Sequence, residues 1–77
     1  MNKQRRKEIE RIINGLISWQ DAIEEVLSEE QDYLDNMPEN LQSSEKAEIA
    51  ENAISNLEEA LDNIRECIDN LESILEG

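Results

Sequence analysis

Two long stretches of the sequence place apolar side chains three and four residues apart, and this spacing constrains the fold most. The first stretch runs from Ile9 to Leu34, and in the second, from Ala47 to Leu75, the alternation is strict. Residues spaced in this way share one face of an α-helix, and strict alternation is the heptad pattern of helices that pack lengthwise. The first set is Ile9, Ile12, Ile13, Leu16, Trp19, Ile23, Val26, Leu27, Tyr33 and Leu34; the second is Ala47, Ala50, Ile54, Leu57, Leu61, Ile64, Ile68, Leu71 and Leu75.

A further apolar line accompanies the heptads of the second stretch. Segments 53–59, 60–66 and 67–73 repeat one plan, and each begins with a small residue. A period of seven is too short for a solenoid, so the repeat predicts one continuous helix. Three apolar positions in seven suit a helical bundle better than a two-stranded coil. The added line is Ala53, Ala60, Cys67 and Ile74.

The segment between the two stretches, residues 35–43, has the character of a turn. Pro38 removes a helical hydrogen bond and clashes with the preceding turn of a helix. We expect Met37 and Leu41 to fold inward over the end of the core. The sequence therefore predicts an all-α fold: a single domain, 1–77, forming an antiparallel helical hairpin with helices near 3–34 and 44–76.

Caps and charges support this hairpin. Ser43 or Ser44 is suited to cap the second helix, and Glu45 and Glu48 in its first turn are favoured by the helix dipole. Five of the seven basic residues lie in the first eleven positions, and the second stretch ends in acids. An antiparallel hairpin brings these opposite charges together. The approximate register pairs residue i with 77−i: Ile9 with Ile68, Leu16 with Leu61, and Ile23 with Ile54.

Two helices leave part of a three-in-seven face exposed, and so small a structure rarely buries enough surface to be stable. We therefore expect a homodimer that forms a four-helix bundle, with a different partner protein as the alternative. A parallel and an antiparallel dimer both remain open. Asn56, Asn63 and Asn70 form an asparagine line that either borders the interface or hydrogen-bonds across it. Cys67 is expected to be a small buried hydrophobe. The expected dimer seam is Ala53, Asn56, Ala60, Asn63, Cys67 and Asn70.

Composition excludes most chemistry. The chain has no His and one Cys, which removes imidazole relays, Ser-His-Asp triads, thiolate zinc sites and internal disulfides. No calcium loop or Glu-x-x-His pattern is present. We expect no catalytic residues, no cofactor, no metal and no enzymatic activity. No transmembrane stretch or signal peptide is recognisable, so we expect a cytoplasmic protein. Its negative charge argues against direct binding to nucleic acid or to an anionic membrane.

The acidic surface is the strongest functional signal. Twenty Asp and Glu residues against seven Lys and Arg give a net charge of −13. Such a surface either keeps a protein soluble or mimics DNA and binds a basic, nucleic-acid-binding surface on a partner. The candidate acidic residues for partner binding are Glu58, Asp62, Glu66 and Asp69.

The two aromatic residues, Trp19 and Tyr33, share a line with Ile12 and Val26. Both are expected to be core or dimer-seam residues, and either one, if exposed, becomes a candidate binding hot spot. Gly15 costs about 1 kcal/mol inside a helix relative to Ala. It marks a tight helix crossing, a kink or a tolerated defect.

The segment Asp35 to Gln42, followed by a small residue, Ser44 and Glu45, resembles the turn of a group of short acidic proteins of Firmicutes and their phages. That group also begins Met-Asn-Lys and carries acidic heptads with Asn-Leu-Glu-Glu-Ala, here Asn56 to Ala60. The resemblance spans nearly the whole chain. Ser43 stands where relatives often have Gly, and it can serve as a cap instead. The resemblance implies a phage or prophage setting and supplies no chemistry.

The favoured hypothesis is a phage-type interaction protein that binds and inhibits or regulates a host protein, such as a defence or nucleic-acid enzyme. The alternatives are a self-assembling scaffold and a small-ligand bundle that binds, for example, a nucleotide. An anionic ligand would meet repulsion everywhere except near Arg5, Arg6 and Arg11.

Overall fold

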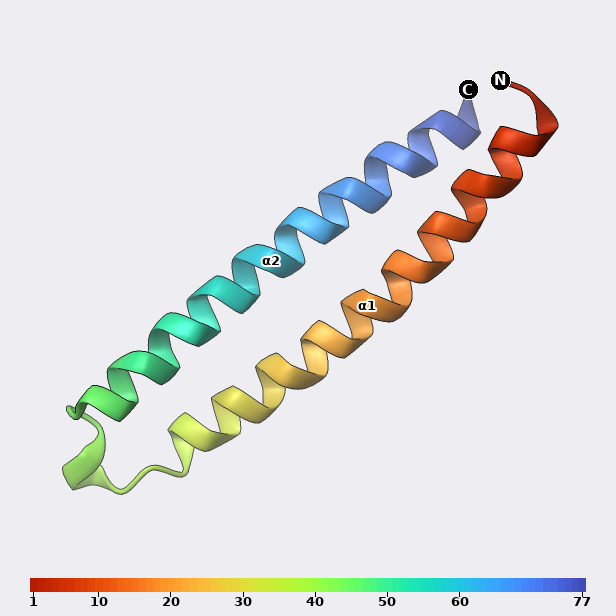
Figure 1. The fold of residues 1–77 in the computed structure, drawn as a ribbon. Helices are drawn as coiled ribbons and strands as arrows, with labels where there is room; N and C mark the ends of the chain where they lie inside the picture. Colours follow the sequence, from red (N-terminus) through yellow and green to blue (C-terminus); the bar gives the residue numbers. More distant parts are fainter.

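A computed structural model describes residues 1–77 as two long antiparallel helices joined by a short turn (Figure 1). Helix α1 spans Lys3–Asp35, the 3-10 turn η1 spans Glu39–Leu41, and helix α2 spans Glu45–Glu76. There are no strands. The predicted all-α helical hairpin is confirmed.

Both helices begin at a capping side chain. Asn2 Oδ1 accepts a hydrogen bond from the Arg5 backbone N–H at 2.8 Å, and Ser44 Oγ accepts one from the Ala47 N–H at 3.3 Å. Such caps satisfy backbone donors that lack a partner within the helix. Of the two serines considered, Ser44 is the cap of α2, with Glu45 and Glu48 in its first turn.

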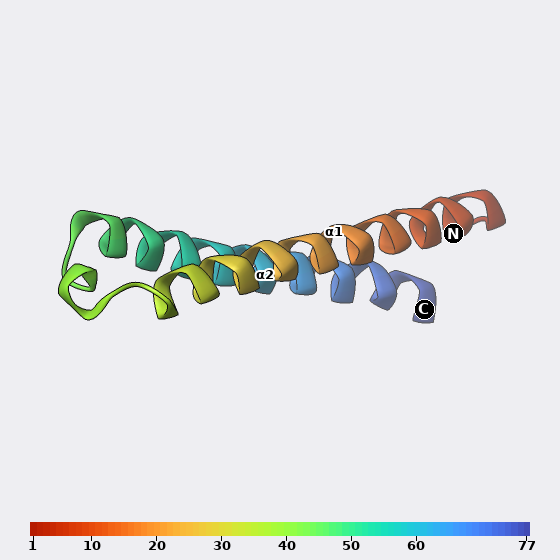
Figure 2. The ribbon, with the colours of Figure 1, turned by 90° about the horizontal axis from the view of Figure 1, so that it is seen from below.

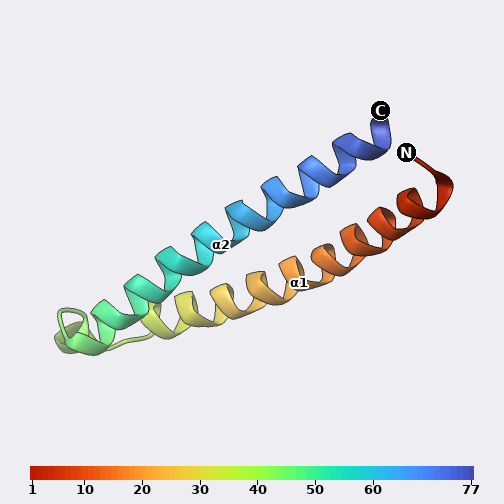
Figure 3. The ribbon, with the colours of Figure 1, turned by 45° about the horizontal axis from the view of Figure 1, so that its top comes forward.

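The hairpin is a narrow rod whose only core is the seam between its helices. Its principal extents are 59 × 15 × 14 Å, and the two termini lie together at one end (Figure 3). Only six side chains are buried, and most of the seam is half-buried because each helix has a single neighbour. The buried residues are Ile13, Met37, Ala47, Ala50, Leu61 and Ile68.

The turn closes one end of this seam with a single side chain. Met37 is buried, as expected, and covers the end of the core, but Leu41 is 41% exposed. The expectation that both would fold inward is therefore wrong for Leu41, because η1 carries it outward beside Pro38.

The predicted pairing of residue i with 77−i is wrong by about one heptad. Arg65 Nη2 lies 3.1 Å from Glu24 Oε1, although the expected register placed Glu24 level with Ala53. Ala53 and Arg65 are about 18 Å apart along a helix, which is beyond the reach of an arginine. Consequently α1 projects past α2 at the termini, and α2 projects past α1 at the turn (Figure 2).

The observed register still places apolar residues opposite one another. Residues of both helices that share a hollow, Leu34 with Glu51 and Gln31 with Ile54, give an offset of about seven residues, which places Leu16 level with Ile68 and Ile23 with Leu61. Ile13 and Leu75 line the same hollow, which agrees with this offset. A slip of seven residues returns every heptad position to an equivalent one, so the apolar pattern is satisfied equally well.

Candidate functional site

The long sides of the hairpin differ in chemistry, and heptad positions identify them. With a and d facing the other helix, a is Ile13 and Gln20 in α1 and Leu61 and Ile68 in α2. The e positions then follow one edge of this seam and the g positions follow the other. We call the side formed by positions b, e and f the acidic side, and the side formed by c and g the apolar side.

The ion pair between the helices lies on the acidic side. Glu24 and Arg65, both e residues, form the interhelical ion pair, and Arg65 Nη1 also lies 3.8 Å from Asp62 Oδ1. Glu10 and Glu72, again e residues, line one hollow. These contacts place the e lines of both helices on the same side of the rod.

All ten acidic residues of α2 occupy b, e or f positions. Glu58, Asp62, Glu66 and Asp69, the acids predicted to bind a partner, are exposed and belong to this set. Besides the contact of Asp62 with Arg65, the backbone oxygen of Asp69 accepts a hydrogen bond from Ser73 Oγ at 2.9 Å, which leaves the Asp69 carboxylate free of it. The acidic side therefore presents a continuous row of solvent-facing carboxylates.

The apolar side carries large exposed hydrophobic residues of α1 at its g positions. Ile12 is 47% exposed, Trp19 68%, Val26 49% and Tyr33 51%. Trp19 and Tyr33 thus lie outside the core of the hairpin, which leaves the dimer seam or a binding hot spot among the predicted roles. Tyr33 and Lys46, both g residues, line one hollow at the turn, so the g lines of both helices also share a side.

Helix α2 contributes small and amide side chains to the same apolar side. Its g positions are Ala53, Ala60, Cys67 and Ile74, beside the c-position asparagines. Cys67 is exposed, so the expectation of a buried cysteine is wrong for the hairpin itself, because its g position lies outside the seam. The six residues predicted for the dimer seam all lie on this side: Ala53, Asn56, Ala60, Asn63, Cys67 and Asn70.

Three further residues extend the apolar side beyond the sequence prediction. Ile49 is 61% exposed and lies one heptad before Asn56. Its place on the apolar side could have been predicted by continuing the asparagine line one heptad toward the N-terminus. Gly15 and Ala22 occupy the c line of α1. Nothing lies within 4 Å of a Cβ built on Gly15, and α1 is continuous there, so Gly15 marks neither a tight crossing nor a helix break within the hairpin.

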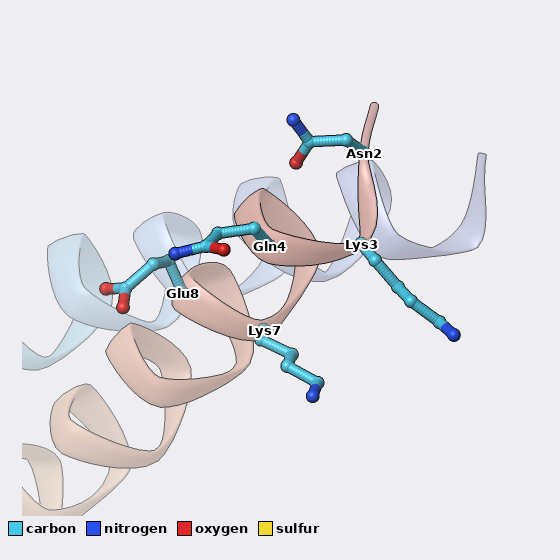
Figure 4. A pocket seen from close by; sticks show the side chains of 5 residues that line it. All are labelled: Asn2, Lys3, Gln4, Lys7 and Glu8. Carbon is cyan, nitrogen blue, oxygen red and sulfur yellow. The ribbon is translucent and has the colours of Figure 1, made fainter.

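The hollows of the rod are shallow. Figure 4 shows the one at the start of α1, lined by Asn2, Lys3, Gln4, Lys7 and Glu8. Lys3 and Lys7 extend outward, and all five residues come from one helix start, so no second element closes over a ligand. No group of three carboxylate or cysteine side chains is arranged to hold a metal ion. Neither helix has an apolar stretch long enough to cross a membrane.

Comparison with known protein families, curated proteins and solved structures gives no match. The apolar side exposes a row of large apolar side chains, and surface patches of this kind commonly mark interaction sites, so it is a candidate interaction surface.

Proposed function

We propose that this chain is a non-catalytic interaction protein that pairs through its apolar side into a four-helix bundle and binds a basic partner protein through the α2 acids of its acidic side. The separation of charge around the rod carries the proposal, since α2 has all its acids on the side opposite the exposed Trp19. The partner class is a host protein with a nucleic-acid-binding surface, such as a defence enzyme, in the bacterial cytoplasm. Binding would inhibit it by occlusion.

The charge density supports mimicry of DNA as the binding mode. Two hairpins side by side would carry twice the net charge of −13 along a rod of 59 Å. That is about one net charge per 2.3 Å, against one per 1.7 Å of axis in DNA. A basic groove that accommodates a duplex would meet a comparable field.

The experiment is affinity capture from nuclease-treated bacterial lysate with the wild-type chain and two matched variants. The first variant neutralises the candidate acids of α2 by E58Q, D62N, E66Q and D69N. The second neutralises four exposed acids of α1 by D21N, E25Q, D32N and D35N, which gives the same change in net charge. Circular dichroism shows whether each variant remains helical.

We expect a near-stoichiometric basic partner that moderate salt releases, because exposed ion pairs are screened. The α2 variant should lose this partner and the α1 variant should keep it. If the α2 variant captures the partner as well as the wild type does, the carboxylates serve only solubility and the binding proposal is wrong.

A further inference from the structure

We infer that the apolar side is covered by a second copy of this chain lying with its turn at the opposite end of the rod. This inference rests on the self-association proposed above and adds its orientation. It follows from three features of the hairpin: its excess surface, the distribution of charge along its length, and the positions of its exposed apolar residues.

The hairpin exposes more surface than a compact protein of its size. The 8.9 kDa chain has an accessible surface of 5928 Å², whereas a compact monomer of that mass exposes about 4,800 Å². The excess is about 1,100 Å², compared with the roughly 800 Å² per partner buried in a standard protein interface. One copy laid along the apolar side removes surface of this magnitude.

A second copy meets few charges on the apolar side, where Glu29 is the only charged c or g residue from Ile12 to Tyr33 of α1. Between Ile12 and Val26 of α1, and between Ile49 and Ile74 of α2, no c or g position is charged. A chain of net charge −13 would be repelled by its twin at almost any other surface. This neutral strip is therefore the surface on which self-association meets least repulsion.

Charge is distributed very unevenly along the rod. The half nearer the turn, residues 22–62, holds thirteen acids and one base, Lys46, which gives a net charge of −12. The half nearer the termini holds seven acids and six bases, a net charge of −1. The basic start of α1 lies in this second half and offsets the acids at the end of α2 (Figure 1).

The uneven distribution decides between the two ways of stacking rods. If the turns lay at the same end, the two halves of charge −12 would face each other over their whole length. If the turns lie at opposite ends, each strongly acidic half faces the almost neutral half of the other copy. Like-charge repulsion therefore selects the opposite-end arrangement.

The exposed apolar residues fit this arrangement. When the two-fold axis passes through the middle of the rod, near Ala22, α1 of one copy lies on α1 of the other copy, and α2 lies on α2. Ile12 then faces Tyr33 of the partner subunit, and Ile49 faces Ile74 of the partner subunit. Trp19 lies close to the centre, where binding hot spots concentrate. The small side chains of α2 permit its close approach to its twin.

The test is a spin-label distance measurement on the full chain. Asn40, at the tip of the turn, is replaced by Cys (N40C) in a C67S background and labelled with a nitroxide. In the opposite-end dimer the two labels should be separated by close to the 59 Å length of the rod. In a same-end dimer they would lie within about three helix diameters, or 30 Å.

A second label separates the orientation from the association itself. Glu59 lies on the acidic side near mid-rod, so labels at E59C in the C67S background should lie within about 30 Å in either dimer. A short distance at both sites overturns the opposite-end arrangement and leaves self-association intact. Absence of dipolar coupling at E59C in a concentrated sample overturns self-association, and with it this inference.

Discussion

The apolar and acidic sides of the hairpin flank the same seam, yet they carry different kinds of side chain. On the acidic side, the interhelical contact is an ion pair between side chains that are 51% and 45% exposed. On the apolar side, α1 exposes Trp19, Ile12, Val26 and Tyr33, and α2 provides alanines between asparagines. The e and g lines of the same helix, about 160° apart, thus belong to sides of different composition. Changes made in matched pairs on the two sides test this difference.

The largest effect is expected from moving a carboxylate to the apolar side. Ala60→Glu places a charge where the second copy packs, and an unpaired charge at an interface is strongly disfavoured. We expect the dimer dissociation constant to rise at least about 100-fold. Sedimentation equilibrium measures it.

The matched control for Ala60→Glu is Ser55→Glu, which adds the same charge to the acidic side of the same helix. It should leave the dissociation constant nearly unchanged. If both variants dissociate equally, net repulsion rather than the apolar side controls association, and the distinction between the two sides fails.

Truncating the central aromatic residue, Trp19, should have the next largest effect on the dimer dissociation constant. Trp19→Ala removes the most exposed large hydrophobic side chain of either helix, and loss of a tryptophan hot spot costs about 2 kcal/mol or more. We expect the dimer to weaken about 30-fold while helicity is retained. Analytical ultracentrifugation and circular dichroism report the two properties; equal affinity in the mutant and wild type would remove Trp19 from the interface.

Adding a methyl group on the apolar side should raise helix stability. Gly15→Ala gains up to about 1 kcal/mol from helix propensity, and the added Cβ has open space within the hairpin. We expect a higher urea midpoint under conditions where the chain is monomeric. A lower midpoint would contradict the open space beside Gly15 within the hairpin.

The smallest effect is expected on the acidic side. Arg65→Gln removes the Glu24 contact at 3.1 Å, but exposed ion pairs contribute about 0.2–1 kcal/mol and are screened by salt. The urea midpoint should fall slightly at low salt and become indistinguishable from wild type near 1 M salt. Arg11→Gln, which removes only the exposed contact with Glu8 within α1, provides the comparison. A larger loss that persists in salt would mean that Arg65 stabilises through packing.

The secondary structure and much of the candidate surface were predictable from local pattern. Heptad spacing and Pro38 predicted two helices and a turn, and Ser44 caps α2 as one of two candidates. The sequence separates Ala53, Ala60 and Cys67 of the expected dimer seam from the main heptads of the second stretch, whereas it groups Trp19 and Tyr33 with the main apolar set of the first stretch. All of these lines recur every seven residues, and the phase within the heptad separates one line from another whether or not the partner helix is known.

The sequence by itself determined the hairpin, the internal seam and the separation of acids from small residues on α2, because each depends on periodicity within one helix. Only the tertiary structure decided the register, the outward position of Leu41 and the alignment of the two g lines on one side. A slip of one heptad preserves every apolar pairing, so periodicity leaves the register undetermined. The geometry of the turn, with Met37 buried and η1 extending beyond α1, accompanies the one register that the hairpin adopts.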